Sequence, residues 1–358
     1  MDRRGRLRVA PSASRRLRLV LNTSETLQTP PLTQRSLRKR RLLRIAASIV
    51  AFLALVTVGG AAAYLTFLNH TVTSNVKHEA LLPTPAPGES APTKPATAKD
   101  SQNFLVIGSD SRAVSASSGR SDVIVLVHIN SDRSRVDLVH FPRDLYVSVP
   151  GQGKDKINAA FAYGGAPLLV RTLQGLVNVP IDHVAIIGFE GFKAMTDAVG
   201  GVDVFAEESS TAPTGNIVKG FNHLNGDQAL AFVRERHQLS EGDISRGKRQ
   251  QAFIKALMLK GLSKDVLLNP INLASFADAA TKNLTVDDGF SMGDMRSEAL
   301  QMRNLRGGDI YFTTAPFTGF GTSPIGGSID ILDTVKIQQL ADALQHDDMA
   351  SYTTAKSN

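Results

Sequence analysis

The 358-residue chain contains no cysteine and no tryptophan. Without cysteine there is no disulfide bond, no thiol nucleophile and no cysteine-ligated zinc site, so stability must come from a packed core. The chain also lacks a G-x-S-x-G nucleophile elbow, an H-E-x-x-H motif, a Walker A loop and a G-x-G-x-x-G fingerprint. These absences weigh against serine hydrolases and nucleotide-binding enzymes.

Positive charge is concentrated at the N-terminus. The chain has 40 Lys and Arg residues against 33 Asp and Glu residues, a formal net charge of +7. Residues 1–44 hold 13 of these basic residues and only two acidic ones, which leaves 27 basic and 31 acidic side chains in the remainder. The basic balance therefore belongs to a short tail and does not by itself indicate a nucleic-acid-binding domain.

An uncharged hydrophobic run, residues 45–68, follows the basic tail. As a helix these residues would reach about 36 Å, enough to cross a bilayer core of about 30 Å. By the positive-inside rule, the basic cluster before the run predicts a cytoplasmic basic tail (1–44), a single transmembrane helix (45–68) and an extracytoplasmic remainder in the cell membrane. A cleaved signal peptide, with Ala61 and Ala63 near the cleavage site, is the alternative.

The rest of the chain divides by composition. Residues 69–102 are rich in Pro, Ala and Thr, which favours an extracytoplasmic linker. Strand-like and helix-like patterns then alternate from residue 103 to residue 346. This alternation predicts an α/β domain in which helices cover both faces of a mixed central sheet. We expect residues 347–358 to form a loose tail.

Acidic and basic residues gather where the first predicted strands begin and end. Asp110 follows the strand at 103–108, Arg120 and Asp122 open the strand at 121–130, and Arg143 closes the hairpin that follows. Carboxylates that meet from separate loops can hold Mg²⁺ beside substrate phosphates, because Mg²⁺ prefers hard oxygen ligands. Solvated surface pairs and caps are the alternative for each residue taken singly.

A second group contains Arg234, Arg236, Asp243, Arg246 and Gln250. The last three stand at i, i+3 and i+7, which places them along one stripe of a predicted helix that begins near Asp243. Arg234 and Arg236 point the same way only in extended chain, which predicts that the preceding helix ends near residue 233. Guanidinium groups suit a pyrophosphate, but a solvated amphipathic helix has the same spacing.

Six strings in order over residues 103–260 together resemble the LytR-CpsA-Psr (LCP) family: NFLVIGSDSR, GRSDVIVLVHI, HFPRDLYVSVPG, KINAAFAYGG, IDHVAIIGFEGFKAMTDAVGGVDV and VRERH…DISRGKRQQ. The resemblance implies an LCP-like sheet and helices around a hydrophobic pocket for a polyprenyl tail. It also implies a membrane-anchored phosphotransferase that ligates a glycopolymer of teichoic acid, capsule or arabinogalactan type from a polyprenyl-pyrophosphate carrier to peptidoglycan.

The resemblance also implies roles for individual residues. Asp110 and Asp122 match the acidic residues associated with Mg²⁺ (or Mn²⁺). The residues that match those around the pyrophosphate are Arg120, Arg143, Arg234, Arg236, Arg246 and Gln250. Catalysis is expected from Asp122, Arg120, Arg246 and Asp243, the last as one candidate for the proton acceptor. Ser245 stands where the family usually has glycine, which bears on the local turn geometry.

The expected partners are the polyprenyl-pyrophosphate-linked glycopolymer, peptidoglycan and the membrane, but no nucleic acid. Three alternatives remain at the level of sequence. The same charged clamp could serve a lipid-pyrophosphate hydrolase, with water as the acceptor. A membrane-bound transcriptional attenuator would have to bind DNA through residues 1–44, which show no helix-turn-helix pattern. A passive lipid- or glycan-binding module is the third.

Overall fold

The computed structural model describes residues 34–85, 91–109 and 121–357. Asp110, Arg120 and most of the basic tail therefore lie outside the described residues. The chain divides into two compact units, residues 1–62 and residues 63–358. Helix α1 (Gln34–Asn75) runs through the boundary. Its segment Ala46–Asn75 is long and apolar enough to cross a membrane, by length and composition alone.

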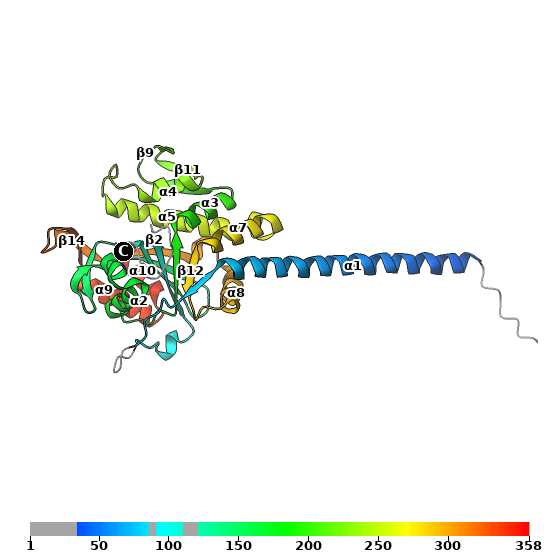
Figure 1. Ribbon diagram of the computed structural model, residues 1–358, viewed down its shortest axis with the longest axis horizontal. Helices are drawn as coiled ribbons and strands as arrows, with labels where there is room; N and C mark the ends of the chain where they lie inside the picture. The colour runs from blue at the N-terminus through cyan, green and yellow to red at the C-terminus, as the bar shows by residue number, and fades with distance from the viewer. Residues whose placement is uncertain (1–33, 86–90, 110–120, 358) are drawn as a thin grey trace, which may run out of the picture. The chain divides into compact units, whose positions relative to one another are not determined.

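The unit of residues 63–358 contains a mixed central sheet, which has seven strands within the described part of the chain (Figure 1). β2 pairs antiparallel with β3 and parallel with β7, while β13 pairs parallel with β4. Both orientations in one sheet confirm the predicted mixed α/β class. The strands in spatial order are β1 (Lys77–Glu79), β12 (Leu284–Asp287), β7 (His183–Gly188), β2 (Gln102–Ser109), β3 (Ser121–Ile129), β4 (Val136–His140) and β13 (Ile310–Thr314).

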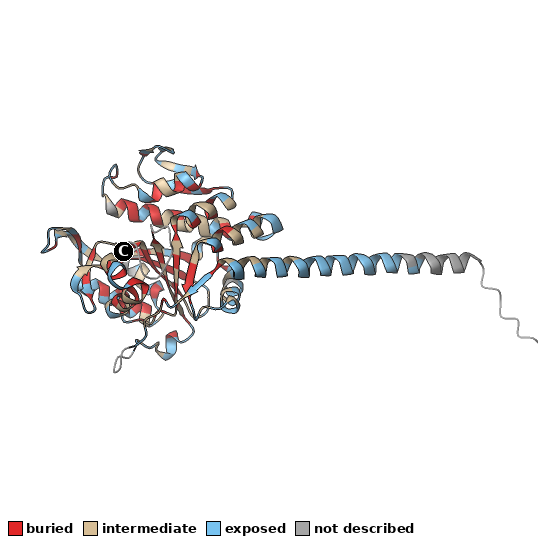
Figure 2. Ribbon diagram, viewed as in Figure 1, coloured by how far each residue is buried: buried red, intermediate tan, exposed pale blue. Residues whose placement is uncertain are grey.

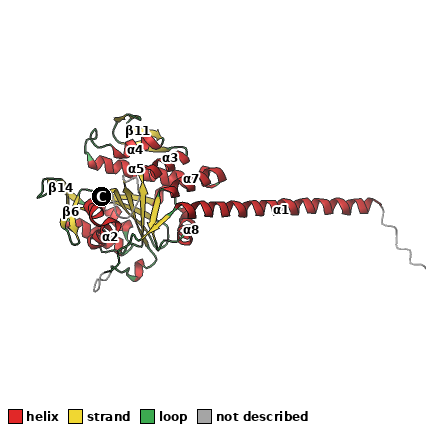
Figure 3. Ribbon diagram, viewed as in Figure 1, coloured by secondary structure: helices red, strands yellow, loops and turns green. Residues whose placement is uncertain are grey.

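Helices cover both faces of this sheet (Figure 3). On one face, α2 (Ile157–Val177), α9 (Thr334–Gln345) and α10 (Met349–Ser357) contribute to a core with alternate residues of the central strands. On the other face, α5 (Asp243–Gly261) packs against Val125, Leu138 and neighbouring apolar side chains. Because successive strand residues face opposite sides, β2 and β3 supply both cores. The central strands are accordingly rich in buried residues (Figure 2).

A second layer of helices and strands builds a separate core beside α5. Its buried residues include Val202, Val204, Phe232 and Phe253. Asn225 begins α4 with a capping box, in which its side chain accepts a hydrogen bond from the Gln228 backbone N–H. The elements of this layer are α3 (Phe189–Ala198), β8 (Val202–Ala206), β9 (Ser210–Ala212), β10 (Gly215–Ile217), β11 (Gly220–Leu224), α4 (Gly226–Arg234), α6 (Lys264–Leu267) and α7 (Pro270–Lys282).

A four-stranded sheet lies next to α2. It contains β5 (Leu145–Val149), β6 (Gly153–Lys156), β14 (Phe317–Thr322) and β15 (Ser328–Leu332). The parallel pairing of β15 with β5 brings Asp330 opposite Leu145, directly after the Arg143–Asp144 segment. Residues far apart in the chain thus meet beside the end of β4. The remaining described elements are α8 (Met292–Gln301) and three short 3-10 helices, Ala96–Ala98, Met302–Asn304 and Gly307–Asp309.

Helix α2 is one element with a local break. Gly164 and Gly165 depart from helical geometry, and Gly165 has φ of 63°. Glycine adopts that left-handed value without a steric penalty. Pro167 follows two residues after Gly165 and sits at the start of the second helical segment, where its missing N–H costs nothing. The break is therefore encoded locally by these three residues.

The predicted linker at 69–102 is wrong in part: residues 80–85 and 91–95 have no regular secondary structure, but the segment begins as helix and strand and is attached to the domain. Helix α1 continues to Asn75, and β1 pairs parallel with β12 at the edge of the central sheet. Leu81 is fully buried in the main core, and Lys94 forms an ion pair of 2.7 Å with Asp182. Composition favoured an extended chain, but a three-residue edge strand and one buried leucine are enough to attach this segment to the domain.

The predicted loose tail is also wrong. Residues Met349–Ser357 form helix α10, and the Met349 side chain is only 2% exposed. Asp347 lies 2.9 Å from His128 Nε2 and accepts a hydrogen bond from the Ser131 backbone N–H. The segment is mostly polar and is attached through one buried methionine and one polar contact, so its sequence shows no apolar periodicity from which a helix could be predicted. The last described residues belong to the domain.

Candidate functional site

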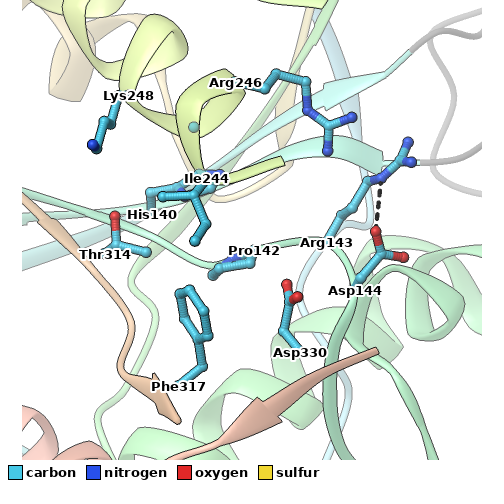
Figure 4. A pocket seen from close by; sticks show the side chains of 11 residues that line it. His140, Pro142, Arg143, Asp144, Ile244, Arg246, Lys248, Thr314, Phe317 and Asp330 are labelled. Atoms are coloured by element: carbon cyan, nitrogen blue, oxygen red, sulfur yellow. Dashed lines mark hydrogen bonds and ion pairs between the residues drawn. The ribbon is translucent and has the colours of Figure 1, made fainter. Parts of the chain in front are cut away.

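A pocket of about 110 Å³ lies where the end of β4 meets the beginning of α5. β4 ends at His140, and the chain passes through Pro142 to Arg143 before β5 begins. Helix α5 contributes Ile244 and Arg246 from its first turn. Figure 4 shows the pocket with these side chains; its other lining residues are Asp144, Gly247, Lys248, Thr314, Phe317 and Asp330.

Arg143 is held between two carboxylates. Its Nη1 donates to Asp122 Oδ1 at 2.9 Å, and its Nε lies 3.3 Å from Asp144 Oδ2. Lys156 Nζ donates to the other oxygen of Asp144 at 2.8 Å. The side chains of Arg143 and Asp122 are 22% and 24% exposed, so the pair is within reach of solvent. The structure therefore brings the predicted residues Asp122 and Arg143 into direct contact.

Arg246 enters the same pocket from helix α5. It is 9% exposed, and Figure 4 shows its guanidinium group on the same side of the pocket as that of Arg143. Helix α5 begins at Asp243, as the spacing predicted. The Asp243 side chain is not among the parts that the structure describes.

Gln250 lies one turn further along the same helix and is 5% exposed. Its Nε2 contacts the Val233 carbonyl oxygen at 3.3 Å, while its Oε1 is buried without a hydrogen-bond partner among the described residues. Ser245 does not disturb the helix start. Its hydroxyl donates to Glu208 Oε1 at 2.7 Å, and the Arg246 backbone N–H still reaches the Gly242 carbonyl at 3.1 Å.

His140 was given no role from the sequence, yet it lines this pocket. It is 6% exposed, and its Nδ1 has no hydrogen-bond partner among the described residues. Burial, aided by the positive charge of Arg246, lowers the pKa of His140 to about 4. The imidazole is therefore neutral at physiological pH. Its ring packs so close to α5 that a Cβ on Gly247 would lie 3.1 Å from His140 Cε1.

Arg234 and Arg236 do not line this pocket. Helix α4 ends at Arg234, one residue later than predicted, and Glu235 is extended with ψ of 133°. The Arg234 guanidinium carbon lies 4.5 Å from the Phe189 ring centroid, a cation–π contact. Arg236 Nε lies 3.4 Å from His237 Nε2. Neither arginine is among the described residues that line the pocket of Arg143 and Arg246.

The described residues contain no group of three or more His, Asp or Glu residues placed to share a metal ion. Asp122 has the hard oxygen donors that Mg²⁺ prefers, and one of them accepts a hydrogen bond from Arg143. Its predicted partner, Asp110, lies outside the described residues. The donor chemistry of Asp122 therefore fits magnesium, although this carboxylate alone does not complete a site.

One wall of the pocket, formed by residues near the C-terminus, was not predicted from the sequence. Thr314, Phe317 and Asp330 come from a region in which no charged cluster was apparent. The Asp330 backbone N–H donates to the Asp144 carbonyl at 2.9 Å, so β15 holds this wall against the Arg143–Asp144 segment. Asp330 reaches the pocket because β15 pairs with β5, and the paired residues are about 185 positions apart in sequence. A local sequence pattern carries no information about such a distant pairing.

A protein family model and several curated proteins match this chain. The model of the LytR_cpsA_psr family matches residues 64–346. Cell wall biosynthesis protein LcpA of Corynebacterium glutamicum is 31% identical over 281 residues, which is 66% of this chain and 54% of LcpA. Polyisoprenyl-teichoic acid–peptidoglycan teichoic acid transferase TagU of Bacillus mycoides is 38% identical over 207 residues, which is 56% of this chain and 66% of TagU. The chain thus spans about half to two thirds of these relatives.

Solved structures share the fold. TagV of B. subtilis superposes with a TM-score of 0.61 at 24% identity, over 70% of this chain and 98% of that structure. A structure described as TagT bound to LI-WTA superposes with a TM-score of 0.58 at 27% identity, over 74% of this chain and 98% of that structure. The arrangement of the sheet and helices in residues 63–358 is therefore one that experimental structures contain.

Proposed function

Because the chain belongs to the LytR_cpsA_psr family, we propose that it transfers a glycopolymer from a polyprenyl-pyrophosphate carrier to peptidoglycan. The relative TagU is named as a transferase that joins teichoic acid to peptidoglycan, and LcpA is named as a cell wall biosynthesis protein. Both names support a cell-wall polymer as substrate. The two names differ, so they do not identify which glycopolymer is transferred.

The observation that carries this proposal is the meeting of Arg143 and Arg246 at one pocket from separate elements. Two guanidinium groups can each donate parallel hydrogen bonds to phosphate oxygens and keep their charge at any physiological pH. The nearly buried position of Arg246 strengthens its interaction with an anion, because solvent screens it little. The site thus has the chemistry of a pyrophosphate clamp.

In the proposed reaction, a hydroxyl oxygen of peptidoglycan forms a bond to the polymer-bearing phosphorus. The bond from that phosphorus to the bridging oxygen breaks, and polyprenyl phosphate leaves with the electron pair. Arg143 and Arg246 neutralise the charge of the phosphate oxygens and hold the group in line, which is most of what phosphoryl transfer requires. Asp243, the first residue of α5, is the proposed acceptor of the hydroxyl proton.

Mg²⁺ is part of the same proposal. Asp122 would hold the ion together with Asp110, and a bound Mg²⁺ would neutralise phosphate charge that the arginines leave uncompensated. Arg120, Arg234, Arg236 and Gln250 are proposed to bind the substrate pyrophosphate as well. Arg234 and Arg236 do not line the pocket of Arg143 and Arg246, so they would have to reach a part of the carrier outside that pocket.

Membrane anchoring through α1 is also proposed. The support is the candidate span Ala46–Asn75 and the basic cluster that precedes it in sequence. The cluster would keep the N-terminus in the cytoplasm and place residues 76–358 outside, on the side of the membrane where peptidoglycan lies. The pocket would then share a compartment with its acceptor.

A transfer assay with the full chain in detergent, lipid-linked polymer and peptidoglycan tests the function. We expect Arg246→Ala to reduce polymer attachment at least about 100-fold, the usual loss when one donor to a transferring phosphoryl group is removed. Arg303→Ala, which removes an exposed arginine whose Nη1 donates to the Leu300 carbonyl oxygen at the end of α8, is the matched control and should retain full activity. Thermal unfolding of both variants verifies folding.

The same assay separates the remaining alternatives. Free polymer without attachment would identify a hydrolase and contradict the transfer proposal. Full attachment by Arg246→Ala would show that the pocket is not the reaction site. Excess EDTA should abolish attachment by the wild-type chain and added Mg²⁺ should restore it; attachment that persists in EDTA would refute the metal proposal alone.

A further inference from the structure

Exposed apolar side chains gather where α6 meets α7. Leu267 is 43% exposed, and Leu268 and Ile271 are each 75% exposed. These three residues, which we call the α6–α7 corner, lie within five positions of one another. Asn269 caps α7 and Pro270 opens it, so the corner is an ordered helix start. A cluster of exposed leucine and isoleucine usually marks a surface that contacts another apolar phase.

Two contacts show what lies beside this corner. Tyr64 Oη donates to the Pro270 carbonyl oxygen at 2.6 Å, and Asn75 Nδ2 donates to Asp278 Oδ1 at 2.9 Å and to Thr281 Oγ1 at 3.2 Å. All of these residues belong to the unit of residues 63–358. The two contacts are about 16 Å apart along α1. Helix α7 therefore runs alongside the last three turns of α1, with its first residue level with Tyr64.

Tyr64 lies inside the apolar part of α1. The uncharged run ends at Leu68, about 6 Å beyond Tyr64 along the helix. Leu65 and Phe67, on the same turns, are 64% and 56% exposed. A tyrosine near the end of an apolar span is typical of the interface between bilayer core and headgroups. The α6–α7 corner thus lies level with helix residues that would contact lipid.

We propose that the α6–α7 corner is immersed in the interfacial region of the membrane in which α1 is anchored. The partner is a phospholipid bilayer surface, and Leu268 and Ile271 would enter the boundary between headgroups and acyl chains. This inference rests on the proposed membrane anchor and adds a second attachment to it. Because α7 is already hydrogen-bonded to the end of α1, the second attachment would restrict the tilt of the domain relative to the bilayer.

The absence of tryptophan makes this contact measurable. In the full chain reconstituted into phosphatidylcholine–phosphatidylglycerol vesicles, Leu268→Trp provides the sole indole. We expect its emission to shift to shorter wavelength and to be quenched by brominated phosphatidylcholine. The matched control is Ile325→Trp, an 89% exposed residue in the turn between β14 and β15, which lies away from α7 in the domain (Figure 1). The emission of this control should be neither shifted nor quenched.

A third variant, Phe52→Trp, reports on the anchor, because residue 52 lies inside the uncharged run. Quenching of Phe52→Trp without quenching of Leu268→Trp would overturn the corner contact and leave the anchor intact. Equal quenching of Leu268→Trp and Ile325→Trp would also overturn it, because the corner would then contact the membrane no more than the control position does. An unquenched Phe52→Trp would overturn the anchor and the inference together.

Discussion

His140 couples the stability of the domain to pH. The unfolded chain binds a proton at this histidine below its ordinary pKa of 6.5, whereas the folded chain resists protonation until about pH 4. The unfolded state therefore binds more protons within this window, and stability falls as the pH decreases through it. Complete loss corresponds to about 3 kcal/mol, at about 1.4 kcal/mol per pKa unit.

We predict that His140→Gln, which removes the titrating group, flattens this part of the pH dependence. Urea unfolding of wild type and variant at pH 7 and pH 4.5 measures the difference. Buried carboxylates with lowered pKa values, such as Asp287, also destabilise the fold in acid, but they contribute equally to both chains. Equal losses of stability in the two proteins would contradict the assignment.

Residues at the site were predictable to different degrees. Arg246 and Gln250 stand on one helical stripe, which spacing alone revealed, but that spacing could not distinguish a ligand-binding stripe from a solvated one. The structure buries both, which a solvated stripe would not. His140 and Asp330 gave no signal, because their proximity to Arg246 arises only from strand pairing and from the close approach of Gly247 to β4.

Among the elements, the segment after α1 departs furthest from its predicted state. We predict that Leu81→Ala destabilises the domain by about 2–5 kcal/mol, because it removes a fully buried side chain from the main core. Thr93→Ala, at an exposed position of the same predicted linker, should change stability by less than about 0.5 kcal/mol. Denaturant midpoints measure both, and equal midpoints for the two variants would restore the linker interpretation.

Longer elements were easier to predict than this segment. Helix α5 was predicted to begin near Asp243 and runs Asp243–Gly261, and its nineteen residues give a repeated apolar pattern. Strands β2, β3 and β4 likewise carry apolar runs bounded by turn residues. β1 has three residues, Lys77, His78 and Glu79, all polar, and is a strand only because β12 offers it an edge. A three-residue sequence is too short to predict which strand it pairs with.

At the scale of the whole molecule, the net charge is positive in the tail of residues 1–44 and negative in the remainder of the chain. Residues 35–44 retain six of the basic residues that set orientation. We therefore predict that deletion of residues 2–34 leaves polymer transfer and membrane insertion unchanged, as measured by the transfer assay and by protease protection of the domain. Loss of function on this deletion would favour a cytoplasmic regulatory role for the tail.

The parallel pairing of β1 with β12 also determines how the domain bears mechanical load. A cell-wall polymer that pulled on the domain would be resisted at the anchor, and the tension would pass through the α1–α7 hydrogen bonds of Tyr64 and Asn75 and then through the chain between Asn75 and Leu81. Three residue pairs of an edge ladder would bear this tension before the buried Leu81 does. Peeling of β1 would release only a few residues of chain, so the domain could yield slightly under tension without opening its core.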